Sequence, residues 1–236
     1  MKALKFALLG AAASLALGGS AFAQEASAVD LSFNVGVASD YVFRGISQTD
    51  EDPQIFAGAD MTAGIFYAGV WASNVDFLDS TDAEFDLYAG VKPTVGPVSL
   101  DLGAVYYVYA DAPTGAEYDY WEIKAAGSIP LGQATLGAAL YYSPDFTGAA
   151  ADEGLYVEVN GAIPLRESFT LSGALGHQDV EFSGGGDVDY TTWNIGVGIA
   201  ATENIGLDIR YWDTDAEDIF GSIAEERLVA SVKLAL

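Results

Sequence analysis

The strongest constraint on the fold is an alternation of apolar with polar or small residues, which recurs along most of this 236-residue chain. In its first instance the apolar residues Leu31, Phe33, Val35, Val37, Tyr41 and Phe43 all fall on one face, a pattern that only Ser39 interrupts. Because successive side chains of a strand point to opposite faces, the alternation predicts strands with one apolar face. Such strands form either a soluble β-sandwich or a barrel with lipid outside and water inside.

The gaps between the alternating segments are short and long in turn. Twelve segments can be delimited, at residues 31–44, 54–62, 65–75, 83–95, 98–109, 118–129, 134–143, 155–163, 169–182, 191–200, 205–214 and 226–236. An up-and-down barrel has short turns at one rim and long loops at the other, whereas a Greek-key sandwich does not sort its connections. We therefore predict an all-β, up-and-down antiparallel transmembrane β-barrel of about 12 strands, with the soluble sandwich as the alternative.

The N-terminus has the features of a cleavable signal peptide. Lys2 and Lys5 form a basic start, residues 6–17 are an apolar run too short to span a bilayer as a helix, and residues 21–23 (AFA) are a small-x-small cleavage site. We predict a signal peptide over residues 1–23 and a single outer-membrane barrel domain over residues 24–236. The predicted location is the cell outer membrane.

The composition limits the partners. The chain has 9 basic and 34 acidic residues and a net charge of −25, which disfavours nucleic acid and anionic membrane surfaces as partners. It has no cysteine, which excludes disulfides and thiolate metal sites. The predicted partners are outer-membrane lipid and small solutes. We predict no cofactor and no metal site.

Charged residues gather on the predicted inward face of the strands, where lipid would not meet them. The acids there are Asp40, Asp60, Asp86, Asp101, Glu122, Glu158 and Asp208. The bases there are Arg44, Lys92, Lys124, Arg210, Arg227 and Lys233. They predict either a hydrated lumen that filters solutes by charge or a salt-bridged, plugged interior that only stabilises the fold. We expect Asp40 and Arg44 near the outer mouth.

Most other acids fall in the predicted long loops, for example at residues 50–52 and 215–218. Their spacing matches no specific calcium loop, so solvated loop charge is the favoured interpretation. Acidic loops at a pore mouth would give a weak preference for cations that fades as salt rises, because such charge is screened over roughly 8–10 Å at physiological salt.

His177 is the single histidine. By alternation it faces outward near the long-loop end of its strand, where an outer-membrane phospholipase would need a serine beside it. Thr191 and Trp193 are its predicted neighbours, so a polar residue of an interfacial girdle is the favoured interpretation and a lipid-modifying enzyme the weak alternative. We predict no catalytic residues and no enzymatic activity.

Two further patterns make the barrel prediction specific. If Gly96-Pro97 is a two-residue turn, Val95 faces Val98 and Lys92 faces Asp101 on the lumen side. Aromatic residues also collect near the strand ends that border long loops, as a membrane girdle would. These are Tyr41, Tyr106, Trp121, Trp193 and Tyr211.

Four blocks resemble the TorF-type family of porins, small β-barrels of Gram-negative bacteria. They are residues 39–49 (SDYVFRGISQT), 71–77 (WASNVDF), 87–90 (LYAG) and 142–146 (YSPDF). The resemblance extends over nearly the whole mature chain, and it implies an outer-membrane location and a pore-like role. The expected function is therefore passive diffusion of small solutes. A non-conducting structural or surface-interaction barrel is the alternative.

The wall assignment predicts how arginine is tolerated on its two faces. Leu102→Arg should lower the free energy of unfolding by roughly 2–4 kcal/mol, because the side chain would face lipid near the middle of the membrane. Asp101→Arg, one position away on the lumen face, should be tolerated far better. Urea unfolding of the two variants in lipid vesicles measures the difference, and equally mild effects would favour the soluble sandwich.

Overall fold

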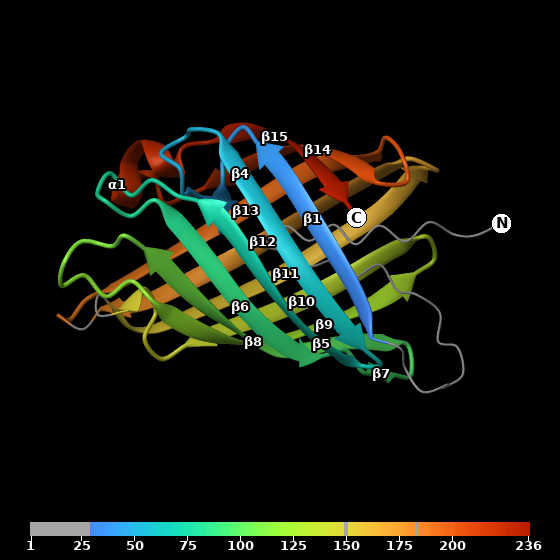
Figure 1. The fold of residues 1–236 in the computed structure, drawn as a ribbon, viewed down its shortest axis with the longest axis horizontal. Coiled ribbons are helices and arrows are strands. Elements are labelled where there is room, and N and C mark those ends of the chain that lie inside the picture. Colours follow the sequence, from blue (N-terminus) through green and yellow to red (C-terminus); the bar gives the residue numbers. More distant parts are fainter. Residues whose placement is uncertain (1–28, 149–150, 183) are drawn as a thin grey trace.

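The computed structural model describes residues 29–148, 151–182 and 184–236, so the predicted signal peptide lies outside the described residues. Within those ranges, twelve antiparallel strands form a closed barrel (Figure 1). They are β1 (Asp30–Ala38), β4 (Gln54–Ala63), β5 (Phe66–Asn74), β6 (Ala83–Val91), β8 (Val98–Ala110), β9 (Tyr120–Leu131), β10 (Ala134–Ser143), β11 (Ala151–Arg166), β12 (Phe169–Phe182), β13 (Asp187–Ala200), β14 (Ile205–Thr214) and β15 (Arg227–Ala235). Closure comes from pairing of β1 with both β4 and β15, which confirms the predicted barrel and excludes the sandwich.

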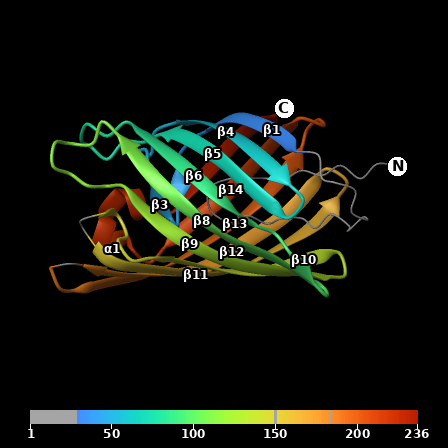
Figure 2. The same ribbon diagram turned by 60° about the horizontal axis from the view of Figure 1, so that its bottom comes forward.

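The two ends of the barrel differ as the spacing of the segments predicts. Short turns join β4 to β5, β9 to β10, β11 to β12 and β13 to β14 at one end. Longer connections lie at the other end, where the β14–β15 loop carries helix α1 (Glu217–Phe220) and the 3-10 helix η2 (Gly221–Ala224) (Figure 2). In the described part of the chain, no helix has the length and apolar character needed to cross a membrane.

Burial in the wall is inverted relative to a soluble protein. Large apolar side chains point away from the barrel and stay exposed, as Val159, Leu175 and Ile195 do at 57%, 52% and 55%. Lumen-facing carboxylates are buried instead, with Asp101 at 8% and Glu158 at 6%. The predicted girdle residues Tyr106, Trp121, Trp193 and Tyr211 are outward and partly exposed. Such a surface suits an apolar surrounding medium.

The predicted register at Gly96-Pro97 is confirmed. Val95 of the short strand β7 (Thr94–Val95) pairs with Val98, and Lys92 Nζ lies 3.9 Å from Asp101 Oδ2. Lys124 Nζ donates to the same oxygen at 2.8 Å, and Tyr67 Oη donates to Asp101 Oδ1 at 2.7 Å. Arginine at position 101 would therefore meet two lysines, so Asp101→Arg is a harsher change than the alternation alone predicts.

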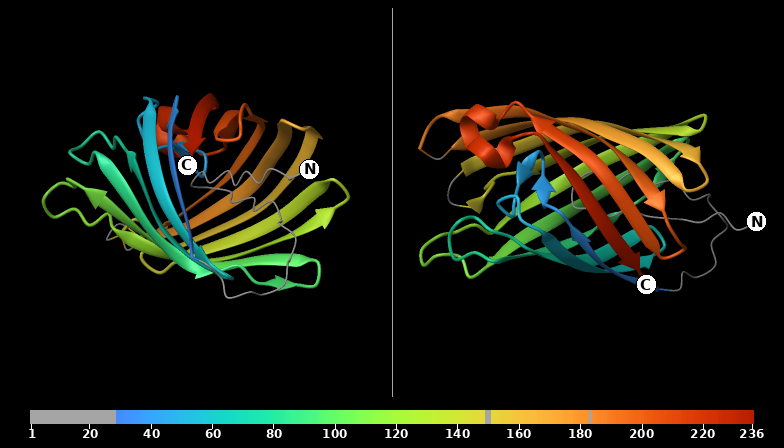
Figure 3. Two further views of the ribbon diagram at one scale, coloured as in Figure 1. Left: turned by 45° about the vertical axis from the view of Figure 1, so that its right-hand side comes forward. Right: turned by 90° about the horizontal axis from the view of Figure 1, so that it is seen from above.

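The first predicted strand, residues 31–44, is wrong beyond its middle. β1 ends at Ala38, and the chain turns into the barrel as a hairpin of β2 (Val42–Phe43) and β3 (Ile46–Ser47) (Figure 3). Both residues of its turn have positive φ, 49° at Arg44 and 88° at Gly45, as a type I′ turn requires. Tyr41, predicted in the outer girdle, is instead 3% exposed inside the barrel.

Two neighbouring alanines on β9 test the two faces of the wall with the same substitution. Ala125 points outward opposite Leu102, whereas Ala126 points inward opposite Asp101. Ala125→Arg should lower the free energy of unfolding by roughly 2–4 kcal/mol if lipid surrounds this face, and Ala126→Arg should cost clearly less because its side chain does not face lipid. Urea titration of both variants in vesicles checks this. A larger cost for Ala126→Arg would contradict a lipid-facing exterior.

Candidate functional site

The hairpin of residues 40–49, here called the lumenal hairpin, contacts the barrel wall on all sides. Tyr41 packs edge-on against Trp71 of β5, with ring centroids 5.4 Å apart, and Phe43 packs against Tyr107 of β8 at 6.0 Å. On the opposite side, Ile46 packs against a cluster that contains residues of the β14–β15 loop. The hairpin therefore occupies the lumen, close to the end that carries the long loops.

Arg44, at the turn of the lumenal hairpin, is held by two buried wall residues. Its Nη2 donates to Glu122 Oε2 of β9 at 2.7 Å, and its Nη1 donates to Gln178 Oε1 of β12 at 2.8 Å. The side chains of Arg44 and Glu122 are 3% and 0% exposed. In a site this dry, a charge pair stays favourable only with good geometry and further hydrogen bonds.

Aromatic rings enclose the same guanidinium. The Arg44 Cζ lies 4.4 Å from the ring centre of Tyr156, 5.1 Å from Tyr141 and 5.7 Å from Phe146. Phe43 of the hairpin adds a fourth ring at 4.6 Å. Cation–π attraction is strongest where water is excluded, so these rings strengthen the hold on Arg44.

Hydrogen bonds from the wall orient the acceptors of this site. Gln178 Nε2 donates to the carbonyl oxygens of Leu155 and Asp179 at 3.3 and 2.9 Å, which leaves Gln178 Oε1 to accept from Arg44. Tyr107 Oη donates to Glu122 Oε2 at 3.1 Å. The second oxygen, Glu122 Oε1, is buried and has no hydrogen-bond partner among the described residues.

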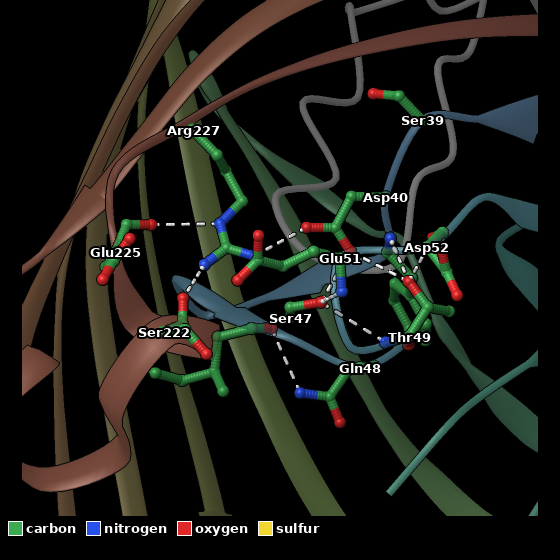
Figure 4. A network of polar contacts seen from close by, with 12 residues as sticks. Ser39, Asp40, Ser47, Gln48, Thr49, Glu51, Asp52, Ser222, Glu225 and Arg227 are labelled. Atoms are coloured by element: carbon green, nitrogen blue, oxygen red, sulfur yellow. Dashed lines mark hydrogen bonds and ion pairs between the residues drawn. The ribbon is translucent and has the colours of Figure 1, made fainter. Parts of the chain in front are cut away.

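A second ion pair fastens the base of the lumenal hairpin (Figure 4). Arg227 Nη1 of β15 donates to Asp40 Oδ2 at 2.8 Å, and Ser47 Oγ donates to Asp40 Oδ1 at 2.7 Å. Arg227 also donates to the carbonyl oxygens of Ser222 and Glu225, at 2.7 and 3.0 Å. The hairpin, the last strand and the β14–β15 loop are thereby tied together.

The other predicted inward residues face the interior from the wall itself. Asp208 pairs with Arg210 at 3.1 Å, Asp60 accepts from Tyr88 Oη at 2.6 Å, and Glu158 accepts from Tyr156 Oη at 2.9 Å. The structure thus brings Arg44 to Glu122 and Asp40 to Arg227, and it joins Asp101 to Lys92 and Lys124. It corrects one point, since Asp40 and Arg44 lie on the lumenal hairpin and not on a wall strand.

Uncharged members of the site do not appear among the predicted residues. Gln178, Tyr141 and Tyr156 are uncharged and so do not stand out by charge, although alternation with outward His177, Leu140 and Leu155 places them inside. One charged residue is also absent from the predicted set: Glu84 accepts from Tyr41 Oη at 2.6 Å and, two positions before Asp86, points to the same inward face. The alternation of inward and outward positions along each strand is the sequence signal that identifies Gln178, Tyr141, Tyr156 and Glu84.

Neither a metal nor a histidine site is assembled in the described parts of the chain. Within residues 29–148, 151–182 and 184–236, no three His, Cys, Asp or Glu side chains gather closely enough to hold a metal ion. His177 is partly exposed on the outer face, with Nδ1 3.3 Å from Thr191 Oγ1 and Nε2 4.0 Å from Asp189 Oδ2. These contacts suit a polar residue at the rim.

A closed barrel with a charged interior is the architecture of outer-membrane porins and channels, and solved structures of that class share this fold. The KdgM porin has 8% sequence identity and a TM-score of 0.58, with 86% of this chain and 98% of that chain covered. The NanC porin has 10% sequence identity and a TM-score of 0.56, with 87% of this chain and 98% of that chain covered. The COG4313 outer membrane channel from Pseudomonas putida F1 has 12% sequence identity and a TM-score of 0.56, with 90% of this chain and 96% of that chain covered.

Sequence comparison places the chain more narrowly. Residues 22–234 match the family described as "Bacterial protein of unknown function (Gcw_chp)", and the chain belongs to this family. No curated protein matches the sequence. The identities to the solved porins are so low that those structures establish the fold alone, and the TorF-type assignment stays a prediction.

For the buried Arg44–Glu122 pair, we expect the single substitution to destabilise the protein more than the double substitution. Arg44→Met should lower the free energy of unfolding by about 3–5 kcal/mol, because it leaves the Glu122 carboxylate buried without its cation. Adding Glu122→Gln should recover most of that loss. Urea titrations in detergent measure both.

The control for this cycle is another intralumenal pair. Arg210→Met removes the partner of Asp208, whose side chain is 17% exposed, and it also removes hydrogen bonds to Asn194 and Ser172. Because these groups are less buried than Glu122, the cost should be smaller, about 1–2 kcal/mol. Equal losses at Arg44 and Arg210 would show that the lumenal hairpin is not anchored through Glu122.

Proposed function

We propose that this protein is an outer-membrane porin of the TorF type, a passive diffusion channel for small solutes that the lumenal hairpin narrows near its outer end. The observation that carries the proposal is the inverted wall of a closed barrel. Its apolar side chains face outward, and its charged side chains line the interior. A bilayer would satisfy the outer face, and water the inner one.

Lumenal charges are the groups that permeating solutes would meet. Most inward bases are matched by an acid, as in Lys124–Asp101, Arg210–Asp208 and Arg227–Asp40. Asp86 has no ion pair within the described ranges. The paired lumen therefore discriminates little by charge.

Acids of the long loops would instead give the entrance a negative charge. Glu51 and Asp52 are exposed between β3 and β4. Asp79 accepts from the Thr81 backbone N–H at 2.7 Å, and this hydrogen bond lowers the pKa of Asp79, which keeps the rim charged in mild acid. We therefore propose a weak preference for cations, set mainly by the loops and reduced by salt.

A non-conducting structural barrel is the second candidate, and the lumenal hairpin itself favours it. Its residues from Asp40 to Thr49 contact wall residues all around the lumen, and Thr49 is fully buried. Planar-bilayer recording of the purified protein separates the two candidates. Discrete conductance steps support the porin, and their absence at high protein concentration supports the structural barrel.

Selectivity is tested by neutralising one acidic loop. The triple variant Asp50→Asn, Glu51→Gln, Asp52→Asn should reduce cation preference at low salt without closing the pore, because it removes charge from the entrance only. Reversal potentials in a salt gradient give the measurement. The control is Glu167→Gln with Glu203→Gln at the short-turn rim, which should change the preference less. Anion preference of the unchanged protein at low salt would overturn the proposal.

A further inference from the structure

We propose that Glu122, Gln178, Tyr141, Phe146 and Tyr156 form a binding site for the guanidinium group of a solute. In the structure the chain's own Arg44 occupies this guanidinium site. A solute that carries a guanidinium group competes with Arg44, and its binding releases the lumenal hairpin from the wall. The binding site stands on the geometry alone, while the consequence for permeation rests on the proposed pore function.

The wall residues of the guanidinium site are arranged without help from the hairpin. Tyr141 pairs in register with Tyr156, and Tyr156 with Gln178, so the three lie in one row across β10, β11 and β12. Glu158 accepts from Tyr156 Oη at 2.9 Å, and Tyr107 Oη donates to Glu122 at 3.1 Å. A site whose side chains are already positioned loses little entropy when a ligand binds.

Two wall glycines make room for the rings. A Cβ at Gly176 would collide with the Tyr156 ring, and one at Gly154 would collide with Phe146. Because neither position carries a side chain, both rings can lie against the wall beside the guanidinium. The space for the rings comes from glycines of the wall strands and does not depend on the lumenal hairpin. The rings could therefore stack on a free ligand as they do on Arg44.

The chemistry of the site selects a guanidinium over an ammonium ion. A guanidinium is planar, can stack on aromatic rings and donates two parallel N–H bonds to one carboxylate. Arg44 uses a single oxygen of Glu122, and the buried Glu122 Oε1 has no partner in the described structure. A free guanidinium, not held by a backbone turn, could use both oxygens and satisfy the orphaned acceptor.

The lumenal hairpin can leave without breaking the barrel ladder. Its hydrogen bonds to wall strands run through side chains, at Tyr41–Glu84, Arg44–Glu122, Arg44–Gln178 and Arg227–Asp40. Its backbone accepts from Asp76 in the β5–β6 connection, where Asp76 N donates to Gln48 O at 2.8 Å. Asp50 and Glu51, which lead back to the wall, both have positive φ, at 50° and 68°, a conformation that non-glycine residues adopt at a cost.

Arg44 is tethered, so it competes with any solute as if it were present at roughly millimolar concentration or above. The Tm of the wild-type protein should therefore rise with a guanidinium solute only in the millimolar range. Removal of the Arg44 side chain should empty the guanidinium site. The solute should then raise the Tm at concentrations at least tenfold lower. This shift separates occupancy of the site from a general effect of the salt.

The test uses the purified full-length mature protein in detergent and methylguanidinium chloride as the probe. Thermal unfolding is followed for the wild type, Arg44→Ala, and Arg44→Ala with Glu122→Gln. Methylguanidinium should raise the Tm of Arg44→Ala saturably. Methylammonium chloride and sodium chloride at equal ionic strength should not, and the double variant should lose the response. Arg44→Lys, which keeps a cation in the site, serves if Arg44→Ala fails to fold, and it should respond at lower concentrations than the wild type.

Bilayer recording then tests release of the hairpin, with methylguanidinium expected to increase the open time of the wild type and to have no such effect on Arg44→Ala. An equal Tm response to methylguanidinium and methylammonium, or none in Arg44→Ala and Arg44→Lys, would overturn the guanidinium site. Saturable binding with unchanged gating would overturn the release step. Saturable binding in a protein that never conducts would support the site and refute the proposed pore.

Discussion

Closure between the first and last strands is the constraint on which the rest of the structure depends. An open edge in a membrane would leave backbone N–H and C=O groups unpaired in hydrocarbon, where each costs several kcal/mol. Here β1 pairs with β15 over Asn34–Ala38 and Ala235–Ser231, and Phe33 and Leu236 exchange two further hydrogen bonds. The seam continues only as far as the Ser39 N–H, which donates to Ala230 O at 2.9 Å. Beyond that point the outer end of β15 has no strand partner in β1.

The lumenal hairpin covers that outer end. Val42 packs with Val229 of β15, and Asp40 pairs with Arg227, so the segment that leaves the wall returns to seal the seam from inside. The same excursion places Arg44 across the lumen on β9 and β12. One short segment thus closes the outer seam and narrows the interior. This double role explains why the hairpin carries two buried ion pairs within five residues of each other.

The sequence predicts the wall well because a strand has a side-chain period of two, and one face must be apolar. Twelve strands, the sorting of the loops and the Lys92–Asp101 register all follow from that rule and from one turn. The alternation rule fails at residues 39–49, because a hairpin enclosed by protein shows the same alternation as a strand of the wall. Gly45 between Phe43 and Ile46 was the available sign of a turn, because glycine adopts positive φ without strain. The partners of Arg44 lie 78 and 134 residues away, and pairing across non-adjacent strands cannot be derived from local patterns.

The separation of Arg44 from its partners also sets an order of assembly. Contacts between segments far apart in the chain form late, because the loop they close must first lose its entropy. Glu122 and Gln178 face a common interior only after β9 to β12 have joined, and Arg227 is positioned only when the final strand is in place. The hairpin is therefore held by side chains that only the assembled wall brings together. Burial of Arg44 therefore reports on the assembly of the whole wall, because the partners that bury it lie 78 and 134 residues away in the chain.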